Sequence, residues 1–161
     1  MSINKYKPHL FVLPEDDANH HIANGFSCNL NLNSRAIQVL PPAGGWHKVV
    51  DKFQEHDVPE MQKNLQRMIV LLIDFDGHEE RLSYVESKIP EELRDRVFVL
   101  GVLSEPESLK RDIQRNWEEI GEALAKDCYE NRNELWGHNL LKHNRTTLDR
   151  MISSVKPYLF N

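Results

Sequence analysis

The chain has 161 residues, a length that fits one compact domain with its own hydrophobic core. It carries 20 Lys and Arg against 25 Asp and Glu, so its formal net charge is −5, and 40% of its residues are hydrophobic. This composition is typical of a globular protein and excludes a disordered or collagen-like chain. The acid excess argues against a general nucleic-acid coat protein, because such proteins carry a basic surplus.

The distribution of apolar residues predicts a cytoplasmic protein. The longest apolar run, 68–73, is too short to cross a membrane. Near the N-terminus the apolar stretch 10–13 is followed at once by Pro14 and three acids, which is not the pattern of a signal peptide. We expect Cys28 and Cys128 to be buried thiols in a reducing compartment, because their wide separation does not suit a metal pair. The sequence predicts no membrane contact and no particular oligomeric state.

Four segments have the composition of β-strands, and helical segments separate them. The third and fourth are near-continuous apolar runs, as expected of parallel strands that are covered on both faces. The predicted strands are 9–13, 36–40, 68–73 and 97–103, and the predicted helices between them are 17–25, 46–53 continuing toward 61–67, and 79–87. Alternation of this kind is typical of layered α/β folds. We therefore predict a small parallel sheet of about four strands between helices, in a Rossmann-like arrangement.

After the fourth strand the pattern becomes purely helical. Ser108 is a candidate N-cap for a helix whose apolar residues, from Ile113 to Cys128, fall close to one face. A second helix follows, with Leu148 among its apolar positions, and Pro157 closes it.

These elements predict a single domain over 1–161, with an α/β core at 9–107 and a helical C-terminal extension at 108–161. Charge is unevenly spread near this extension: 105–134 carries nine acids and five bases, whereas 135–161 carries four bases and one acid. A basic terminal helix suits contact with a phosphate backbone or an acidic protein, and a solvated helix face is the simpler alternative. The extension is thus a candidate docking surface for a protein partner.

Carboxylates follow three of the four predicted strands. The carboxyl ends of parallel strands meet at one edge of the sheet, where ligands of open α/β sheets bind. Carboxylates gathered there repel one another unless a cation or a proton neutralises them, and Mg²⁺ prefers oxygen ligands of this kind. The acids are Glu15, Asp16 and Asp17 after the first strand, Asp74 and Asp76 after the third, and Glu105 after the fourth.

Each of these acids also has a purely structural explanation. Asp16 or Asp17 is placed to cap the helix that follows. Asp74 and Asp76 suit a solvated turn, and Glu105 suits a helix N-terminus. A metal site is favoured by the combination of an acid after the first strand with an Asp-x-Asp after the third.

This combination resembles a Toprim domain, the metal-binding module of topoisomerases, bacterial primases and OLD-type nucleases. Glu15 matches the single glutamate of that family, and Asp74 with Asp76 matches its Asp-x-Asp, although Asp16 stands where many members have glycine. The resemblance covers about residues 9–107. It implies that the two aspartates hold Mg²⁺ or Mn²⁺ and that the glutamate binds metal or assists acid–base chemistry. We therefore expect a stand-alone Toprim-like protein that acts on phosphodiester groups, with nucleic acid as the substrate, in the manner of a nuclease or nicking enzyme.

Three alternatives remain open. The Asp-x-Asp also resembles the first motif of haloacid-dehalogenase-type phosphatases, which implies Asp74 as nucleophile and Asp76 as general acid. A receiver domain is the second, with Asp16 and Asp17 as the acidic pair, Asp74 as phosphoryl acceptor and Ser104 as the hydroxyl, but without the expected fifth strand and its lysine. The third is a non-catalytic interaction or regulatory module with a Toprim-like fold that docks a partner protein.

Two further segments are candidate contacts for phosphate. His20 and His21 belong to the first helix near the expected site, where a polar helical turn is the simpler interpretation. Gly44 and Gly45 precede a predicted helix that carries Lys48, so their backbone N–H groups and the lysine suit an anion. The spacing is not that of a Walker motif, and a simple turn is the alternative.

Overall fold

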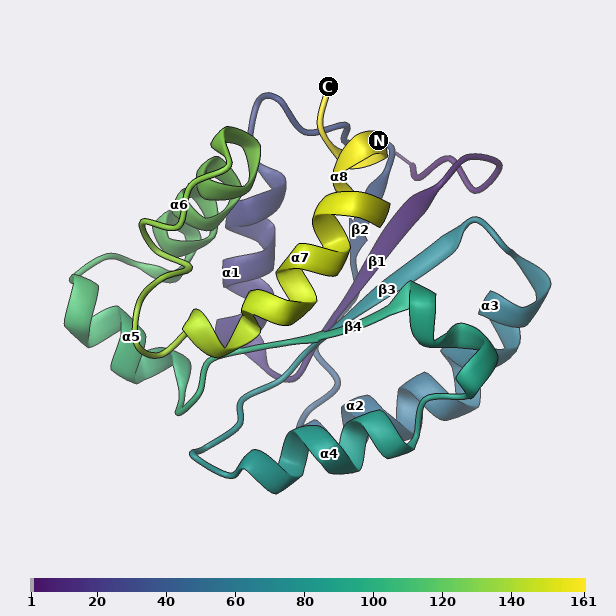
Figure 1. Ribbon diagram of the computed structural model, residues 1–161, viewed down its shortest axis with the longest axis horizontal. Coiled ribbons are helices and arrows are strands. Elements are labelled where there is room, and N and C mark those ends of the chain that lie inside the picture. The colour runs from purple at the N-terminus through teal and green to yellow at the C-terminus, as the bar shows by residue number, and fades with distance from the viewer. Residues whose placement is uncertain (1) are drawn as a thin grey trace.

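The computed structural model describes residues 2–161, which form a four-stranded parallel sheet with helices on both faces (Figure 1). The strands are β1 (His9–Pro14), β2 (Ile37–Val39), β3 (Arg67–Leu72) and β4 (Val97–Leu100). Their order across the sheet is β2-β1-β3-β4. The predicted α/β class is confirmed, and the observed strands differ from the predicted ones only at their ends.

The order of the strands creates a switch point beside β1. The chain passes from β1 to β2 on one side and then returns across β1 to β3 on the other. Leu10 of β1 pairs with Ile37 of β2 and with Met68 of β3, so β1 lies between them in register. Crossovers that leave a strand in opposite directions open a crevice at its carboxyl end, where ligands bind in such folds.

Two apolar cores lie on opposite faces of the sheet, because successive side chains of a strand point to opposite sides. Leu10 and Val12 belong to one core and Phe11 and Leu13 to the other. The helices on the first face are α1 (Asp17–Ser27), α5 (Pro106–Ile113), α6 (Trp117–Glu130), α7 (Arg145–Ser154) and α8 (Lys156–Leu159). The segments on the second face are α2 (Trp46–Lys52), the π-helical turn η1 (Phe53–Asp57), α3 (Val58–Lys63), α4 (Glu79–Ser87) and the 3₁₀ segment η2 (Glu91–Arg96).

The C-terminal half is helical as predicted, but its first helix is divided. Gln114 adopts a left-handed conformation (φ 55°) that ends α5, and Asn116 caps α6 in a reciprocal capping box with Glu119. Ser108 therefore lies inside α5, and its prediction as the N-cap is wrong. The residue that precedes α5 is Glu105, which makes no side-chain capping bond.

The predicted extension, 108–161, covers the first face of the sheet together with α1. Ile120 and Leu124 of α6, together with Leu148 of α7, are buried in the core on this face. The short 3₁₀ segment η3 (Lys142–Asn144) leads into α7. The predicted extension therefore completes the core of the α/β domain.

Two smaller expectations concern the cysteines and membranes. Cys28 is exposed where α1 ends, so its prediction as a buried thiol is wrong, whereas Cys128 is half-buried. Within residues 2–161, no helix has the length and apolar character that a membrane crossing requires.

Candidate functional site

Glu15 follows β1 and is held by its backbone at the edge of the sheet. Its N–H donates to Leu72 O at 2.9 Å, which extends the pairing of β1 with β3 by one residue. Its carbonyl accepts from the amides of Gly44 (2.8 Å) and Gly45 (3.1 Å). The side chain is only 8% exposed, so the sheet and the 44–45 turn fix a largely buried carboxyl at the switch point.

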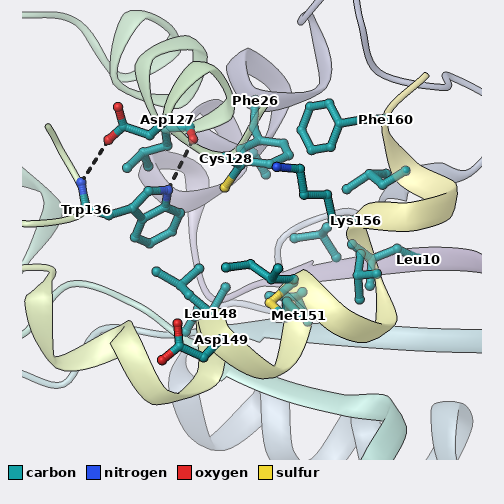
Figure 2. Close-up of a pocket in the computed structure, with 18 of the residues that line it drawn as sticks. Leu10, Phe26, Asp127, Cys128, Trp136, Leu148, Asp149, Met151, Lys156 and Phe160 are labelled. Atoms are coloured by element: carbon teal, nitrogen blue, oxygen red, sulfur yellow. Dashed lines mark hydrogen bonds between the residues drawn. The ribbon is translucent and has the colours of Figure 1, made fainter. Parts of the chain in front are cut away.

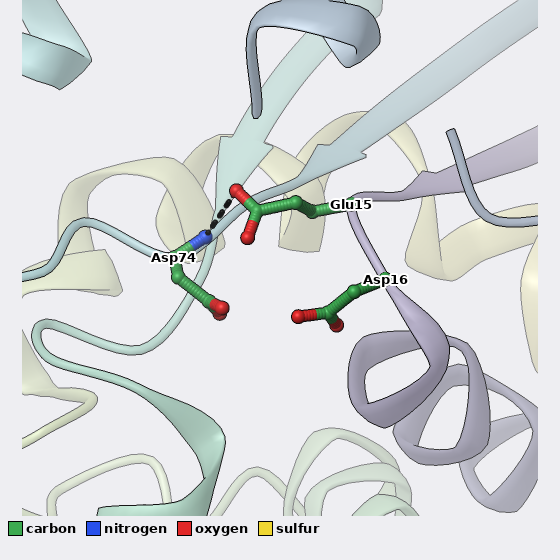
Figure 3. Close-up of side chains that lie close together, drawn as sticks. All are labelled: Glu15, Asp16 and Asp74. Atoms are coloured by element: carbon green, nitrogen blue, oxygen red, sulfur yellow. Dashed lines mark hydrogen bonds between the residues drawn. The ribbon is translucent and has the colours of Figure 1, made fainter. Parts of the chain in front are cut away.

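Asp16 is the N-cap of α1. Its Oδ1 accepts from both the backbone N–H and the side-chain Nδ2 of Asn19, each at 3.0 Å. The capping alternative for Asp16 is confirmed, and the cap turns its carboxylate toward the crevice (Figure 3). Asp17 lies in the first helical turn and is exposed.

Asp74 follows β3 and is 5% exposed. Its Oδ1 accepts from Asn19 Nδ2 at 2.9 Å, and its backbone N–H lies 3.4 Å from Glu15 Oε1 (Figure 3). Asn19 therefore donates to both Asp16 and Asp74, and it joins α1 to the end of β3. Asn19 was not among the predicted site residues, although its place three residues after an N-cap aspartate is a signal that could have indicated it.

Glu15, Asp16 and Asp74 form a compact group of carboxylates. Each offers one oxygen, and these three atoms lie within 4.8 Å of one another (Figure 3). Two oxygens that bind one Mg²⁺ lie at most about 4.2 Å apart, because each bond is about 2.1 Å long. Neighbouring oxygens around an octahedral Mg²⁺ lie closer, about 3.0 Å apart, so the three side chains can share one ion if they rotate toward a common point.

Burial controls the protonation of this group. Burial, aided by the neighbouring charges of Glu15 and Asp16, raises the pKa of Asp74 to about 8, although the bond from Asn19 opposes the shift. Burial likewise raises the pKa of Glu15. The carboxylates are thus close enough that full ionisation is unfavourable without a positive charge among them.

Asp76 lies outside this group, in contrast to the expectation that it would share a metal with Asp74. Its backbone is left-handed (φ 48°), and its Oδ2 pairs with Arg81 Nη1 at 2.9 Å. The same Nη1 donates to the carbonyl of Asp74 at 2.6 Å. The turn after β3 therefore carries the second aspartate away from the first, and Asp16 from α1 takes the place predicted for it.

The remaining predicted acids and histidines also lie outside the group. Glu105 is exposed ahead of α5. His21 pairs with Glu118 at 2.9 Å and belongs to the contact between α1 and α6. His20 lies 3.2 Å from the Asn24 side chain on its own helix.

The predicted anion site at Gly44 and Gly45 has a different role. Both amides already donate to the carbonyl of Glu15, so they position that residue and are not free to hold an anion. Lys48 lies beside the turn: a Cβ placed on Gly44 would be 3.7 Å from its Nζ. Of the predicted anion site, Lys48 remains as a cation beside the turn that holds Glu15.

The chain matches no protein-family model, no curated protein and no solved structure. Fold and site alone therefore define its class: an α/β protein with a wound parallel sheet and three convergent carboxylates at the switch point of the sheet. The Toprim resemblance stays a prediction that rests on the residues.

Proposed function

We propose that Asp74, Asp16 and Glu15 bind Mg²⁺ or Mn²⁺, and that the protein is a Toprim-like phosphodiesterase acting on nucleic acid. The observation that carries the proposal is the convergence of three carboxylates, two of them buried, from the ends of two adjacent strands. Acids at such a position are costly to ionise unless a cation compensates them. Their cost is explained if the site binds a divalent ion.

The donor set fits a hard cation. All three groups are carboxylates, the oxygen ligands that Mg²⁺ and Mn²⁺ prefer. Asn19 Oδ1 is also buried without a hydrogen-bond partner among the described residues, so an uncompensated polar atom belongs to a residue that contacts the group. A buried acceptor of this kind is suited to a water molecule of the ion's hydration shell.

The proposed roles follow from how each carboxylate is held. Asp16 and Asp74 are bridged by Asn19 and would be the fixed ligands. Glu15 is held only through its backbone and one long contact, and its raised pKa suits a group that binds metal or accepts a proton from the attacking water. A bound ion would supply charge neutralisation at the phosphate and a lower pKa for the attacking water.

Cations next to the group support a phosphate-containing substrate. Arg81 contacts the carbonyl of Asp74, and Lys48 lies beside the turn that holds Glu15. A polyanion can therefore approach this edge despite the net charge of −5, because the local charges are mixed and a bound ion would add two positive charges.

Cleavage of supercoiled plasmid and of single-stranded DNA tests this proposal, with Mg²⁺, Mn²⁺ or EDTA present. We expect metal-dependent nicking that Asp74→Asn abolishes. The control is Asp17→Asn. Asp17 is an exposed aspartate in the first turn of α1 and lies outside the carboxylate group, so this variant should retain activity. If the wild-type protein cleaves neither substrate with either metal, the nuclease proposal fails, and the non-catalytic alternative, with 108–161 docking a partner, is favoured.

A receiver-like function is a second candidate, favoured by two observations. The strand order matches the first four strands of the 2-1-3-4-5 order found in flavodoxin-like folds. The hydroxyl of Ser104, at the same edge, is buried without a partner among residues 2–161. Under this proposal a carboxylate oxygen of Asp74 attacks the phosphorus of a phosphoryl donor, and the donor's leaving group departs. Incubation with acetyl phosphate and Mg²⁺ should then add one phosphoryl group by mass to the wild type and none to Asp74→Asn.

A further inference from the structure

A large apolar cavity lies on the face of the sheet covered by α1, α6, α7 and α8 (Figure 2). Its volume is about 430 Å³, within the usual range of small-molecule sites in proteins. Glu15, Asp16 and Asp74 do not line it, so it is a separate feature from the carboxylate group.

The helices that cover the cavity are held by separate sets of contacts. Glycines bring α1 and α6 into backbone contact: a Cβ at Gly25 would lie 2.1 Å from Glu118 O, and one at Gly121 would lie 1.9 Å from Ile22 O. These two helices therefore form one tight unit on the β2 side of the sheet.

Helix α7 is anchored at β4 and not at the α1–α6 pair. At its start, the Asn144 side chain exchanges two hydrogen bonds with the backbone of Gly101. In its middle, Arg150 donates to the carbonyl of Val97 at 2.9 Å. The chain then continues into α8, which is bound to the loop before β2. Both ends of α7 are thus anchored, and the cavity lies between α7 and the α1–α6 pair.

The interior of the cavity is apolar. Leu10, Val70 and Leu100 form its floor on the sheet, and Leu124 and Met151 line its walls. Such a lining offers no hydrogen bonds to ordered water, so displacing water from it with an aliphatic chain is favourable.

The carboxylates that line the cavity are already engaged. Asp127 Oδ2 accepts from the backbone amide of Trp136 at 3.2 Å (Figure 2). It also accepts from the amide of Leu135 at 2.7 Å, and both bonds stabilise the turn after α6. Asp149 pairs with Arg145 at 3.0 Å. Neither acid is an open acceptor for a cationic ligand.

Lys156 differs from the other cations of the lining. Arg132 and Arg145 are each paired with carboxylates of their own segments. Among the lining cations of residues 2–161, Lys156 alone has no carboxylate partner. Its Nζ reaches from α8 to the end of α6, where it donates to Asn131 Oδ1 at 2.5 Å and to Tyr129 O at 3.5 Å. An ammonium without a carboxylate partner thus lies beside an apolar interior.

We propose that this cavity binds an aliphatic carboxylate, with the chain inside the cavity and the carboxylate paired with Lys156. A neutral ligand would leave the ammonium uncompensated, and a short polar anion would leave the apolar interior unfilled. A medium-length chain with one anionic end satisfies both parts of the site.

Calorimetric titration with decanoate, below the concentration at which it forms micelles, tests the proposal. Decanol supplies the same chain without the charge, and acetate supplies the charge without the chain. We expect decanoate to bind one-to-one and more tightly than decanol, and acetate not to bind. Lys156→Met should weaken decanoate about tenfold or more and leave decanol unchanged. The matched control is Lys142→Met, because Lys142 is exposed and does not line the cavity.

A second variant tests the location of the chain independently of its head group. Met151→Trp extends into the cavity and should abolish binding of both decanoate and decanol. Asp74→Asn should bind decanoate like the wild type, which separates this site from the proposed metal centre. The proposal is overturned if decanoate does not bind, if decanol binds equally well, or if decanoate affinity is unchanged by either Lys156→Met or Met151→Trp.

Discussion

Asn19 Nδ2 lies 2.9 Å from Oδ1 of Asp74, and this contact joins the first turn of α1 to the end of β3. The same nitrogen donates to Asp16 Oδ1 at 3.0 Å. One amide group therefore holds two carboxylates together at the point where their mutual repulsion is greatest.

Asn19→Ala removes this bridge and should destabilise the protein. We expect the free energy of unfolding to fall by about 1–3 kcal/mol, because the buried Asp74 carboxyl loses its side-chain donor and Asp16 loses one of its two donors. Urea denaturation measures the change. Asn24→Ala, at a half-buried position on the same helix, is the control and should cost less. Equal losses for the two variants would contradict the bridging role.

The raised pKa of Asp74 predicts a pH dependence of stability in the absence of divalent cations. In the unfolded chain this carboxyl loses its proton near its ordinary value of 3.8, whereas in the folded protein it keeps the proton until about pH 8. The folded state thus binds more protons between these values, so the contribution of Asp74 to stability falls as pH rises through this window and then levels off.

Comparison of the wild type with Asp74→Asn in EDTA isolates this effect. Between about pH 5 and about pH 8, urea denaturation should show the wild type losing more stability than the variant, which has no proton to lose at this position. Addition of Mg²⁺ at the higher pH should restore stability to the wild type only. A wild type that gains stability relative to the variant over this window would contradict the assignment.

The close contact between α1 and α6 predicts that Gly121 tolerates no side chain. In an open helix, glycine to alanine is stabilising by about 0.5–1 kcal/mol. Here a Cβ would lie 1.9 Å from Ile22 O and 2.6 Å from Phe26 N, so Gly121→Ala should instead destabilise the protein by about 1–3 kcal/mol. Lys126→Ala, at an exposed position on the same helix, should change stability by less than about 0.5 kcal/mol. Thermal or urea denaturation separates the two results.

Much of the fold follows from local patterns. The apolar runs that became β3 and β4 are long enough to be recognised alone, and α4 spans the predicted 79–87. The break between α5 and α6 was missed because Gln114, an ordinary helix former, adopts a left-handed conformation there. In the sequence, only the capping pair of Asn116 and Glu119 indicates that a second helix, α6, begins there.

The candidate site was predicted in part. Glu15 and Asp74 lie together as expected, because strand ends of a parallel sheet meet at one edge. Asp16 lies in the carboxylate group where Asp76 was expected, since Asp-x-Asp spacing places two side chains together only while the backbone remains extended. The left-handed turn at Asp76 and its bond to Arg81 depend on tertiary contacts that the spacing does not report.

Calorimetric titration of Mg²⁺ and Mn²⁺ at about pH 8, where Asp74 is half ionised before metal is added, tests the central claim most directly. We predict that the wild type binds one ion and that Asp74→Asn and Asp16→Asn each weaken binding about tenfold or more. Asp17→Asn and Asp76→Asn should bind like the wild type, because neither side chain belongs to the group. A wild type that binds neither metal, or an Asp74→Asn variant that binds as tightly as the wild type, would contradict the metal site.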